Sequence, residues 1–131
     1  MNAIFPAANE DELQIQMVNW LRCVLRPGVM FWHTPNGGSR NVCEASKMKA
    51  MGVLAGITDL IFLWRTEDSA GHARYWLLFV EVKMPGGRYT ASQKEVMPRL
   101  QAMGAPVETA RSIDDLQTIL SRHDVPCRAR W

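Results

Sequence analysis

The 131-residue chain has few of the cysteines and histidines that stabilise small proteins through disulfides or bound metal ions. Its three cysteines, Cys23, Cys43 and Cys127, are odd in number and form no Cys-x-x-Cys pair. Such a set argues against a disulfide framework and is typical of a reducing cytoplasm. The three histidines are also scattered, so we expect no structural zinc site. A chain of this length buries a core without such staples, so we expect one domain over residues 1–131, with residues 1–8 and 124–131 as its flexible ends.

The chain also lacks a large excess of positive or negative charge, and it lacks long apolar runs. The formal net charge is only +2. This balance does not by itself indicate a nucleic-acid binder, so any such surface must be local. No apolar run is long enough to cross a membrane, and the first residues have no basic leader, so neither insertion nor export is expected. We therefore expect a cytoplasmic protein, in a bacterium or a phage-infected host cell.

Two apolar runs, residues 57–64 and 75–82, dominate the middle of the chain. They are rich in branched and aromatic residues and too short for buried helices, so they predict two β-strands. The polar segment between them predicts a hairpin turn centred near Ala70. Without a bulge, the numbers of paired residues sum to about 140, which places Asp59 opposite Glu81 and Ile61 opposite Phe79. Both runs are apolar on both faces, so we expect the pair to be central in its sheet and covered on each side.

Two acids and a lysine gather at one end of this predicted hairpin. Because side chains alternate along a strand, Asp59, Glu81 and Lys83 project from the same face. Opposed Cβ atoms lie about 4.5–5.5 Å apart, which lets two carboxylates hold one cation with oxygen ligands at about 2.0–2.1 Å. Charged groups are seldom buried unless they are paired or bind a metal. The alternative is a surface salt bridge between Glu81 and Lys83, with Asp59 capping a loop.

The remaining patterns predict an α/β domain in the order helix, strand, helix, hairpin, helix, strand, helix. Asn9 is expected to cap a first helix that runs to about Arg26. Thr90 opens a later helix, and Gln93 is its capping-box partner. Pro98 is expected to kink that helix unless the helix restarts there. The other elements are expected at residues 29–33, 42–51, 105–110 and after Ser112.

Several motifs around the hairpin form one family pattern: Gly52, Gly56, Ile57-Thr58-Asp59, Glu81-Val82-Lys83 and Gln93. With them, the chain resembles the VRR-NUC family (virus-type replication-repair nucleases) of the PD-(D/E)XK nuclease superfamily. Thr58 stands where the family often has proline, which leaves the acid in place. The resemblance extends from about Glu10 to the final helix. It implies a single restriction-endonuclease-like domain, with a central mixed β-sheet flanked by helices on both faces.

The resemblance also implies a set of catalytic residues: Glu10, Asp59, Glu81, Lys83 and Gln93. Asp59, Glu81 and Glu10 would bind Mg²⁺, with Mn²⁺ as a substitute, because an oxygen-only site suits both ions. Glu10 matches the family's Glu-x-x-apolar-Gln spacing in the first helix, and Glu12 is its competitor. Lys83 would either stabilise developing charge or help to deprotonate the attacking water, and both roles remain open.

The implied function is a Mg²⁺-dependent DNA endonuclease that hydrolyses phosphodiester bonds. We expect selectivity for branched DNA or four-way junctions, in replication, repair or recombination. The alternative is a non-catalytic nucleic-acid-binding or assembly module on the same fold. The candidate DNA-binding residues lie in a turn-rich loop, on the second helix and after the second hairpin strand: Asn36, Gly37, Arg40, Lys47, Lys49 and Arg88. The alternative for them is an ordinary loop and a solvated helix face.

Apolar side chains suggest self-association. Five tryptophans and eight methionines are many for this length. The candidates for an exposed interface patch are Trp20, Met30, Trp32, Met48, Met51 and Trp131. A two-fold homodimer would present two active sites to branched DNA. The alternative is that these side chains are all core and that the protein is a monomer.

Overall fold

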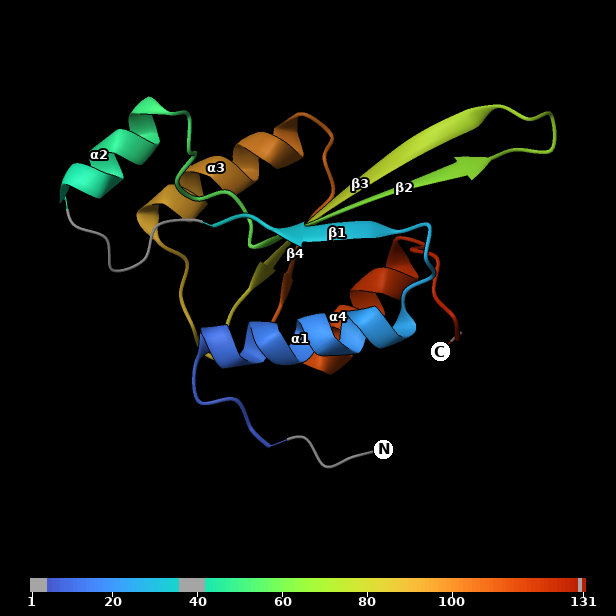
Figure 1. The fold of residues 1–131 in the computed structure, drawn as a ribbon, viewed down its shortest axis with the longest axis horizontal. Coiled ribbons are helices and arrows are strands. Elements are labelled where there is room, and N and C mark those ends of the chain that lie inside the picture. The colour runs from blue at the N-terminus through green and yellow to red at the C-terminus, as the bar shows by residue number, and fades with distance from the viewer. Residues whose placement is uncertain (1–4, 36–41, 130) are drawn as a thin grey trace.

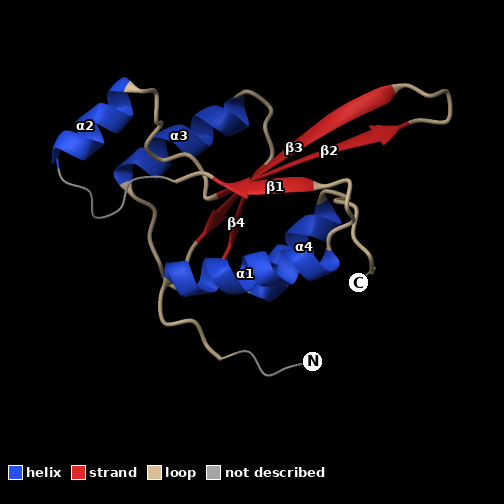
Figure 2. Cartoon of the chain, in the orientation of Figure 1, coloured by secondary structure: helices blue, strands red, loops and turns tan. Residues whose placement is uncertain are grey.

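The computed structural model describes residues 5–35, 42–129 and 131, which fold into a four-stranded sheet with helices on both faces (Figures 1 and 2). The elements are α1 (Glu10–Val24), β1 (Met30–His33), α2 (Val42–Ala50), β2 (Leu60–Glu67), β3 (Ala73–Val82), α3 (Ala91–Ala102), β4 (Val107–Ala110) and α4 (Ile113–Arg122). This order confirms the expected α/β arrangement. None of the helices in the described part of the chain has the length and apolar character needed to cross a membrane.

The sheet is mixed and has the strand order β1-β2-β3-β4. The pairs β1/β2 and β2/β3 are antiparallel, and β3/β4 is parallel. The expected register is confirmed, since Ile61 pairs with Phe79. The Asp68 carboxylate closes the turn by accepting hydrogen bonds from the backbone N–H groups of Ala70 and His72, at 2.9 and 2.8 Å. β2 begins three residues later than the apolar run predicts. It also ends three residues later, because strand pairing uses the backbone and therefore continues through polar residues.

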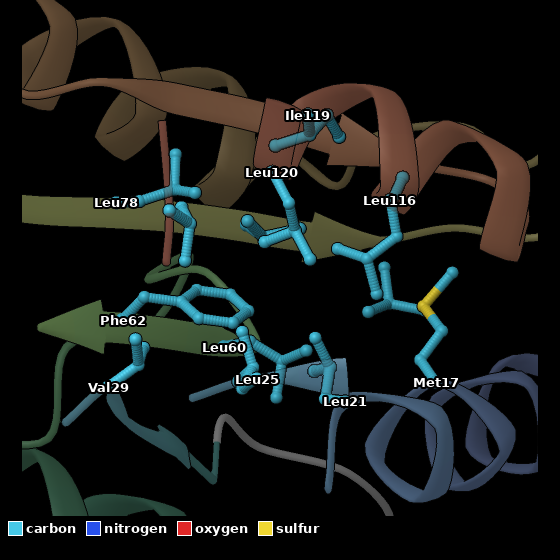
Figure 3. Packing of buried hydrophobic residues seen from close by; sticks show 14 of the residues in the cluster. Met17, Leu21, Leu25, Val29, Leu60, Phe62, Leu78, Leu116, Ile119 and Leu120 are labelled. Atoms are coloured by element: carbon cyan, nitrogen blue, oxygen red, sulfur yellow. The ribbon is translucent and has the colours of Figure 1, made fainter. Parts of the chain in front are cut away.

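One face of the sheet packs against α1 and α4 and forms the hydrophobic core (Figure 3). Alternate residues of the hairpin point into it, as the two-residue period of a strand requires. They meet apolar side chains at helical spacing on α1 and α4. The buried residues that make this contact are Leu60, Phe62, Leu78, Val80, Val82, Leu13, Met17, Leu21, Leu116, Ile119 and Leu120.

The described residues of the C-terminal tail dock on the end of α1. The backbone N–H of Arg26 donates to the Pro126 carbonyl at 3.1 Å, and the N–H of Arg128 donates to the Val24 carbonyl at 2.8 Å. Val125 is buried in the core. Trp131 contacts the Trp20 ring, with 5.6 Å between the ring centres. Tertiary hydrogen bonds and one buried valine thus hold residues that look like a polar tail.

The outer half of the hairpin corrects a second expectation. Tyr75, Trp76 and Leu77 are exposed, so the two strands are not covered on each side along their whole length. β1 pairs only with residues 60–63 of β2, and β4 pairs only with residues 79–82 of β3. Beyond these limits the hairpin extends away from the rest of the sheet (Figure 1).

The other face of the sheet carries α3, whose first turn is fixed by the loop before β2. Thr90 and Gln93 form the expected capping box, and α3 runs as one helix through Pro98. Gly56 has a φ of +89°, and a Cβ there would lie 2.3 Å from the Ser92 carbonyl oxygen. Only glycine permits this approach without displacing the backbone. The loop that leads into Asp59 is therefore in direct contact with the start of α3.

Replacing Gly56 with alanine should destabilise the protein strongly, because a methyl group has no space against Ser92. Gly52, in the same loop, also has a positive φ of +97°, but a Cβ there would meet nothing within 4 Å. Gly52→Ala is thus a matched control that carries only the conformational cost, about 1–2 kcal/mol. We expect Gly56→Ala to lower the free energy of unfolding, measured in urea, by at least about 1–3 kcal/mol more than the control does. Equal losses for the two variants would contradict the close contact.

Candidate active site

Asp59 and Glu81 lie together at the inner end of the hairpin, on the face that α3 covers. Val80 and Val82 point into the core, so alternation turns Glu81 to the opposite face. Asp59 directly precedes β2, and its Oδ2 accepts a hydrogen bond from the Val82 backbone N–H at 2.8 Å. The sequence therefore predicted the position of this acid pair correctly.

The backbone of Asp59 is held from the side of β1. Its carbonyl accepts hydrogen bonds from the Thr34 backbone N–H at 2.9 Å and from His33 Nδ1 at 2.8 Å. His33 must carry its proton on Nδ1 to donate to a carbonyl oxygen. Together with the Val82 contact, these bonds fix Asp59 between two strands, and His33 acts as a strand residue that supports it.

Gln93 connects Glu81 to the start of α3. Its side-chain Oε1 accepts from the Thr90 backbone N–H at 2.9 Å, which completes the capping box. Its Nε2 donates to Glu81 Oε2. The two roles that the sequence left open, a helix cap and a neighbour of the site, are therefore filled by opposite ends of one amide. The cap orients the amide and so aims its N–H groups at the acid.

Glu81 is wholly buried, with 0% of its surface exposed, and this environment disfavours its charge. Burial first, and then the neighbouring Asp59 carboxylate, raise the pKa of Glu81 from 4.5 to about 9, while the Lys83 ammonium opposes the rise. Two acids this close cannot both ionise without a compensating cation. Glu81 therefore keeps its proton near neutral pH when no cation is bound beside it.

Lys83 is 4% exposed and lies beside an aromatic ring. Its Nζ lies 5.8 Å from the centre of the Tyr89 ring, and the Arg111 guanidinium lies 5.9 Å from the same ring centre. The Tyr89 hydroxyl hydrogen-bonds to Thr109 Oγ1 at 2.6 Å. A ring face attracts a cation, so Tyr89 helps to hold the buried ammonium in place.

Arg111 fixes the loop that follows Lys83. Its Nη1 donates to the carbonyl of Met84 at 2.9 Å and to that of Gly87 at 2.8 Å. Sequence reasoning missed Arg111 and Tyr89. The sequence places Arg111 near the site only if β4 is known to run parallel to β3. Val82 then pairs with Ala110, so Lys83 and Arg111, which follow them, lie at the same end of the two strands.

Glu10 is not gathered with the acid pair. It is exposed at the first residue of α1, and no three His, Cys, Asp or Glu side chains in the described residues form a group that could hold a metal ion. Glu12, its competitor, serves the helix start: its backbone N–H donates to Asn9 Oδ1, and its Oε2 accepts from the Ala8 N–H. Glu12 thus has a structural role, and Glu10 remains a prediction as a third ligand.

Three of the six candidate DNA-binding residues lie in the described part of the chain. Lys47 and Lys49 lie on α2, and they and Arg88 are exposed. Asn36, Gly37 and Arg40 lie outside the described residues. The DNA-binding role of all six stays a prediction.

The acid pair fits a small divalent cation. Its donors are carboxylate oxygens, which suit Mg²⁺ and Mn²⁺. Glu81 Oε1 is buried and has no hydrogen-bond partner among the described residues. The same is true of the side-chain oxygen of Thr34, the residue whose backbone N–H contacts Asp59. Buried acceptors are normally satisfied. An unpartnered carboxylate oxygen beside a second carboxylate is what an oxygen-ligated cation would use.

Glu81→Gln should stabilise the metal-free protein above about pH 5. Because the pKa of Glu81 is raised on folding, the unfolded chain releases a proton that the folded chain retains, and stability falls as pH rises from about 4.5 to 9. Glutamine removes this dependence, so we expect the variant to unfold several degrees above the wild type at pH 8.

The same variant tests the cation. Mg²⁺ or Mn²⁺ should raise the unfolding temperature of the wild type but not that of Glu81→Gln. The exposed Glu95→Gln on α3 is the control and should behave as the wild type. A parallel pH dependence of the wild type and Glu81→Gln would contradict the buried carboxyl.

Comparison with known proteins places this geometry in a family. The VRR-NUC domain model matches residues 3–114. A solved structure of a VRR_NUC domain protein is similar to this chain, with 27% sequence identity, 93% of each chain covered and a TM-score of 0.63. No curated protein matches the chain. The family model covers most of the chain, and the acid pair lies within the matched residues, so the chain belongs to the VRR-NUC domain family, a nuclease-type family.

Proposed function

We propose that this protein is a Mg²⁺-dependent DNA endonuclease that hydrolyses phosphodiester bonds. One observation carries the proposal: a buried carboxylate pair, with an unpartnered oxygen on Glu81, lies close to a buried lysine. A purely structural site would neutralise these charges or satisfy these atoms, because uncompensated burial is costly. The membership in a nuclease-type family supports the same function.

Asp59 and Glu81 would hold Mg²⁺, with Mn²⁺ as a substitute, and Glu10 is the proposed third acid. When bound, the ion supplies stabilisation of charge on a phosphoryl oxygen and lowers the pKa of a coordinated water. Gln93 fixes the orientation of Glu81 through the contact with Oε2. Lys83, held against Tyr89, provides a positive charge for the developing negative charge or helps to remove a proton from the water.

We also propose that DNA shape determines selectivity, with branched DNA or four-way junctions as the substrates. The described residues are used for one sheet and its covering helices, so selectivity within them would rest on the shape of the DNA. Recognition of a branch requires no base contacts, since backbone and shape contacts position a protein on DNA. A homodimer would supply two sites for two strands.

A second candidate is a non-catalytic nucleic-acid-binding module. The observation that favours it is that only two acids gather at the site among the described residues. Fold alone does not fix function. Binding of DNA by the wild type with no cleavage under any metal condition would favour this module over the nuclease.

Cleavage should require the acid pair and a divalent cation. We expect the wild type to cut DNA with Mg²⁺ or Mn²⁺, and to cut four-way junctions in preference to flapped or linear duplexes of matched sequence. Asp59→Asn and Glu81→Gln should each reduce the cleavage rate at least about 100-fold, and a chelator should abolish it. Glu95→Ala is the exposed control. Full cleavage by both site variants, or in excess chelator, would contradict the proposal, and equal rates on all substrates would contradict the selectivity.

Substitution of Lys83 should affect turnover, whereas substitution of an exposed lysine should affect DNA binding. A charge that acts mainly in the transition state lowers kcat when removed and leaves affinity nearly unchanged. We expect this of Lys83→Ala. Lys47→Ala should instead weaken DNA binding and flatten its dependence on salt. Equal losses of affinity and turnover in Lys83→Ala would reassign Lys83 as a phosphate contact.

A further inference from the structure

Lys83 is an almost fully buried cation that forms no ion pair within the described part of the chain. Glu81 lies two residues earlier and projects to the same face, because side chains alternate along a strand. Buried charges are normally paired or bound to a metal, and a lysine side chain is a flexible four-carbon stem. Something other than an ion pair must therefore fix the position of this ammonium.

Residues 84–89 form a loop that folds back over the Lys83 side chain. The Gly87 N–H donates to the Met84 carbonyl at 2.9 Å, which closes a turn. A Cβ on Gly87 would lie 3.7 Å from Lys83 Cδ, so the Gly87 backbone lies next to the lysine stem. Two residues further on, the centre of the Tyr89 ring lies 5.8 Å from Lys83 Nζ. The loop thus covers both the stem and the charged end of the lysine.

Arg111 holds this loop closed. Its Nη1 donates to the carbonyls of Met84 and Gly87, at 2.9 and 2.8 Å, and so joins both ends of the turn. Hydrogen bonds from a charged donor are about twice as strong as those between neutral groups. The Arg111 backbone N–H is itself fixed by Asp115 Oδ2 at 2.9 Å, in the first turn of α4. One arginine therefore ties the loop to the start of this helix.

Tyr89 is fixed from two sides. Its hydroxyl hydrogen-bonds to Thr109 Oγ1 at 2.6 Å, and Thr109 pairs with Glu81 across β3 and β4. The Arg111 guanidinium lies 5.9 Å from the ring centre, so the ring attracts this second cation as well as Lys83. The ring that contacts the ammonium is thus tied both to β4 and to the arginine that closes the loop.

Opening of the loop would let Lys83 compete for the acid pair. Opposite charges attract more strongly in a protein interior than in water, so a released ammonium would turn toward Glu81. An ion pair there would use the Glu81 oxygen that has no partner among the described residues. It would also withdraw the positive charge that the developing charge on a phosphodiester needs.

We propose that Arg111 and Tyr89 are positioning residues, which close the loop over Lys83 and keep its ammonium apart from the acid pair. The lysine then stays directed to the substrate, and the Glu81 oxygen stays directed to the cation. The effect on turnover rests on the proposed nuclease function. The separation of Lys83 from Glu81 does not, because it concerns only the chain itself and its binding of an ion.

Cleavage by matched variants tests the effect on turnover. Arg111→Met and Tyr89→Leu should each lower the single-turnover rate at least about tenfold, while DNA affinity stays within about twofold of the wild type. Arg111→Lys keeps a charged donor and Tyr89→Phe keeps the ring, so both should cut within about threefold of the wild type. Arg122→Met is the control and should cut as the wild type does, because Arg122 pairs with Glu108 and has no bond to the loop among the described residues.

A double variant separates positioning from a merely structural role. When Lys83 is alanine, no ammonium remains to be positioned. Tyr89→Leu/Lys83→Ala should therefore cut no more slowly than Lys83→Ala. A structural role would slow the double variant further, by the same factor that Tyr89→Leu shows in the wild-type background.

Mn²⁺ binding, measured by calorimetry without DNA, gives a second readout. Tyr89→Leu should bind Mn²⁺ at least about threefold more weakly than Tyr89→Phe, because the released ammonium competes for Glu81. The double variant Tyr89→Leu/Lys83→Ala has no such competitor and should bind Mn²⁺ at least as tightly as the wild type.

Wild-type turnover in both Arg111→Met and Tyr89→Leu, or losses that add to that of Lys83→Ala, would overturn the proposed effect on turnover. Equal Mn²⁺ affinity of Tyr89→Leu and Tyr89→Phe would overturn the separation of Lys83 from Glu81. A wild type that binds Mn²⁺ but cuts no DNA would count against the nuclease function, and the Mn²⁺ comparison would still decide whether the loop restrains Lys83.

Discussion

The burial of Glu81 beside Asp59 is the constraint on which the site depends. Two carboxylates in a protein interior repel each other and lose hydration, and here this raises the pKa of Glu81 to about 9. The fold tolerates the pair because each acid has a fixed donor: Gln93 contacts Glu81, and the Val82 N–H contacts Asp59. One oxygen of Glu81 remains without a partner among the described residues. The arrangement costs stability when no cation is bound, and the unpartnered oxygen is the acceptor that the proposed cation would use.

The donors around this pair belong to segments that are far apart in sequence. Gly56 lets the loop before Asp59 contact the first turn of α3, which brings Gln93 to Glu81. Arg111, after β4, holds the loop that follows Lys83. Sites that hold strained or costly groups need such support, because unsupported side chains relax away from their working geometry. The helix caps and the strand ends thus serve the acid pair as well as the fold.

The β2/β3 hairpin has two halves in different environments. Its inner half is paired on both edges and packed against α1 and α4, and it carries the acids at its end. Its outer half has neither pairing nor cover among the described residues, and exposes tyrosine, tryptophan and leucine. On β3 the apolar run of residues 75–82 crosses from the outer half into the inner half, so the sequence pattern of this strand does not distinguish them. The lengths of β1 and β4 make the difference, because they set how far the sheet extends.

The sequence by itself determined the elements, the hairpin register and the meeting of Asp59 with Glu81, because these follow from side-chain period and local turn chemistry. It also identified Gln93 by its capping box. It did not determine the docking of the C-terminal tail, the exposure of the outer hairpin, or the parts of Tyr89 and Arg111. These depend on which strands are neighbours and where each pairing stops, and such long-range contacts leave no periodic trace in the chain. The tertiary structure alone decided them, through the parallel pairing of β4 with β3, the limited length of both edge strands, and the backbone hydrogen bonds between the tail and the end of α1.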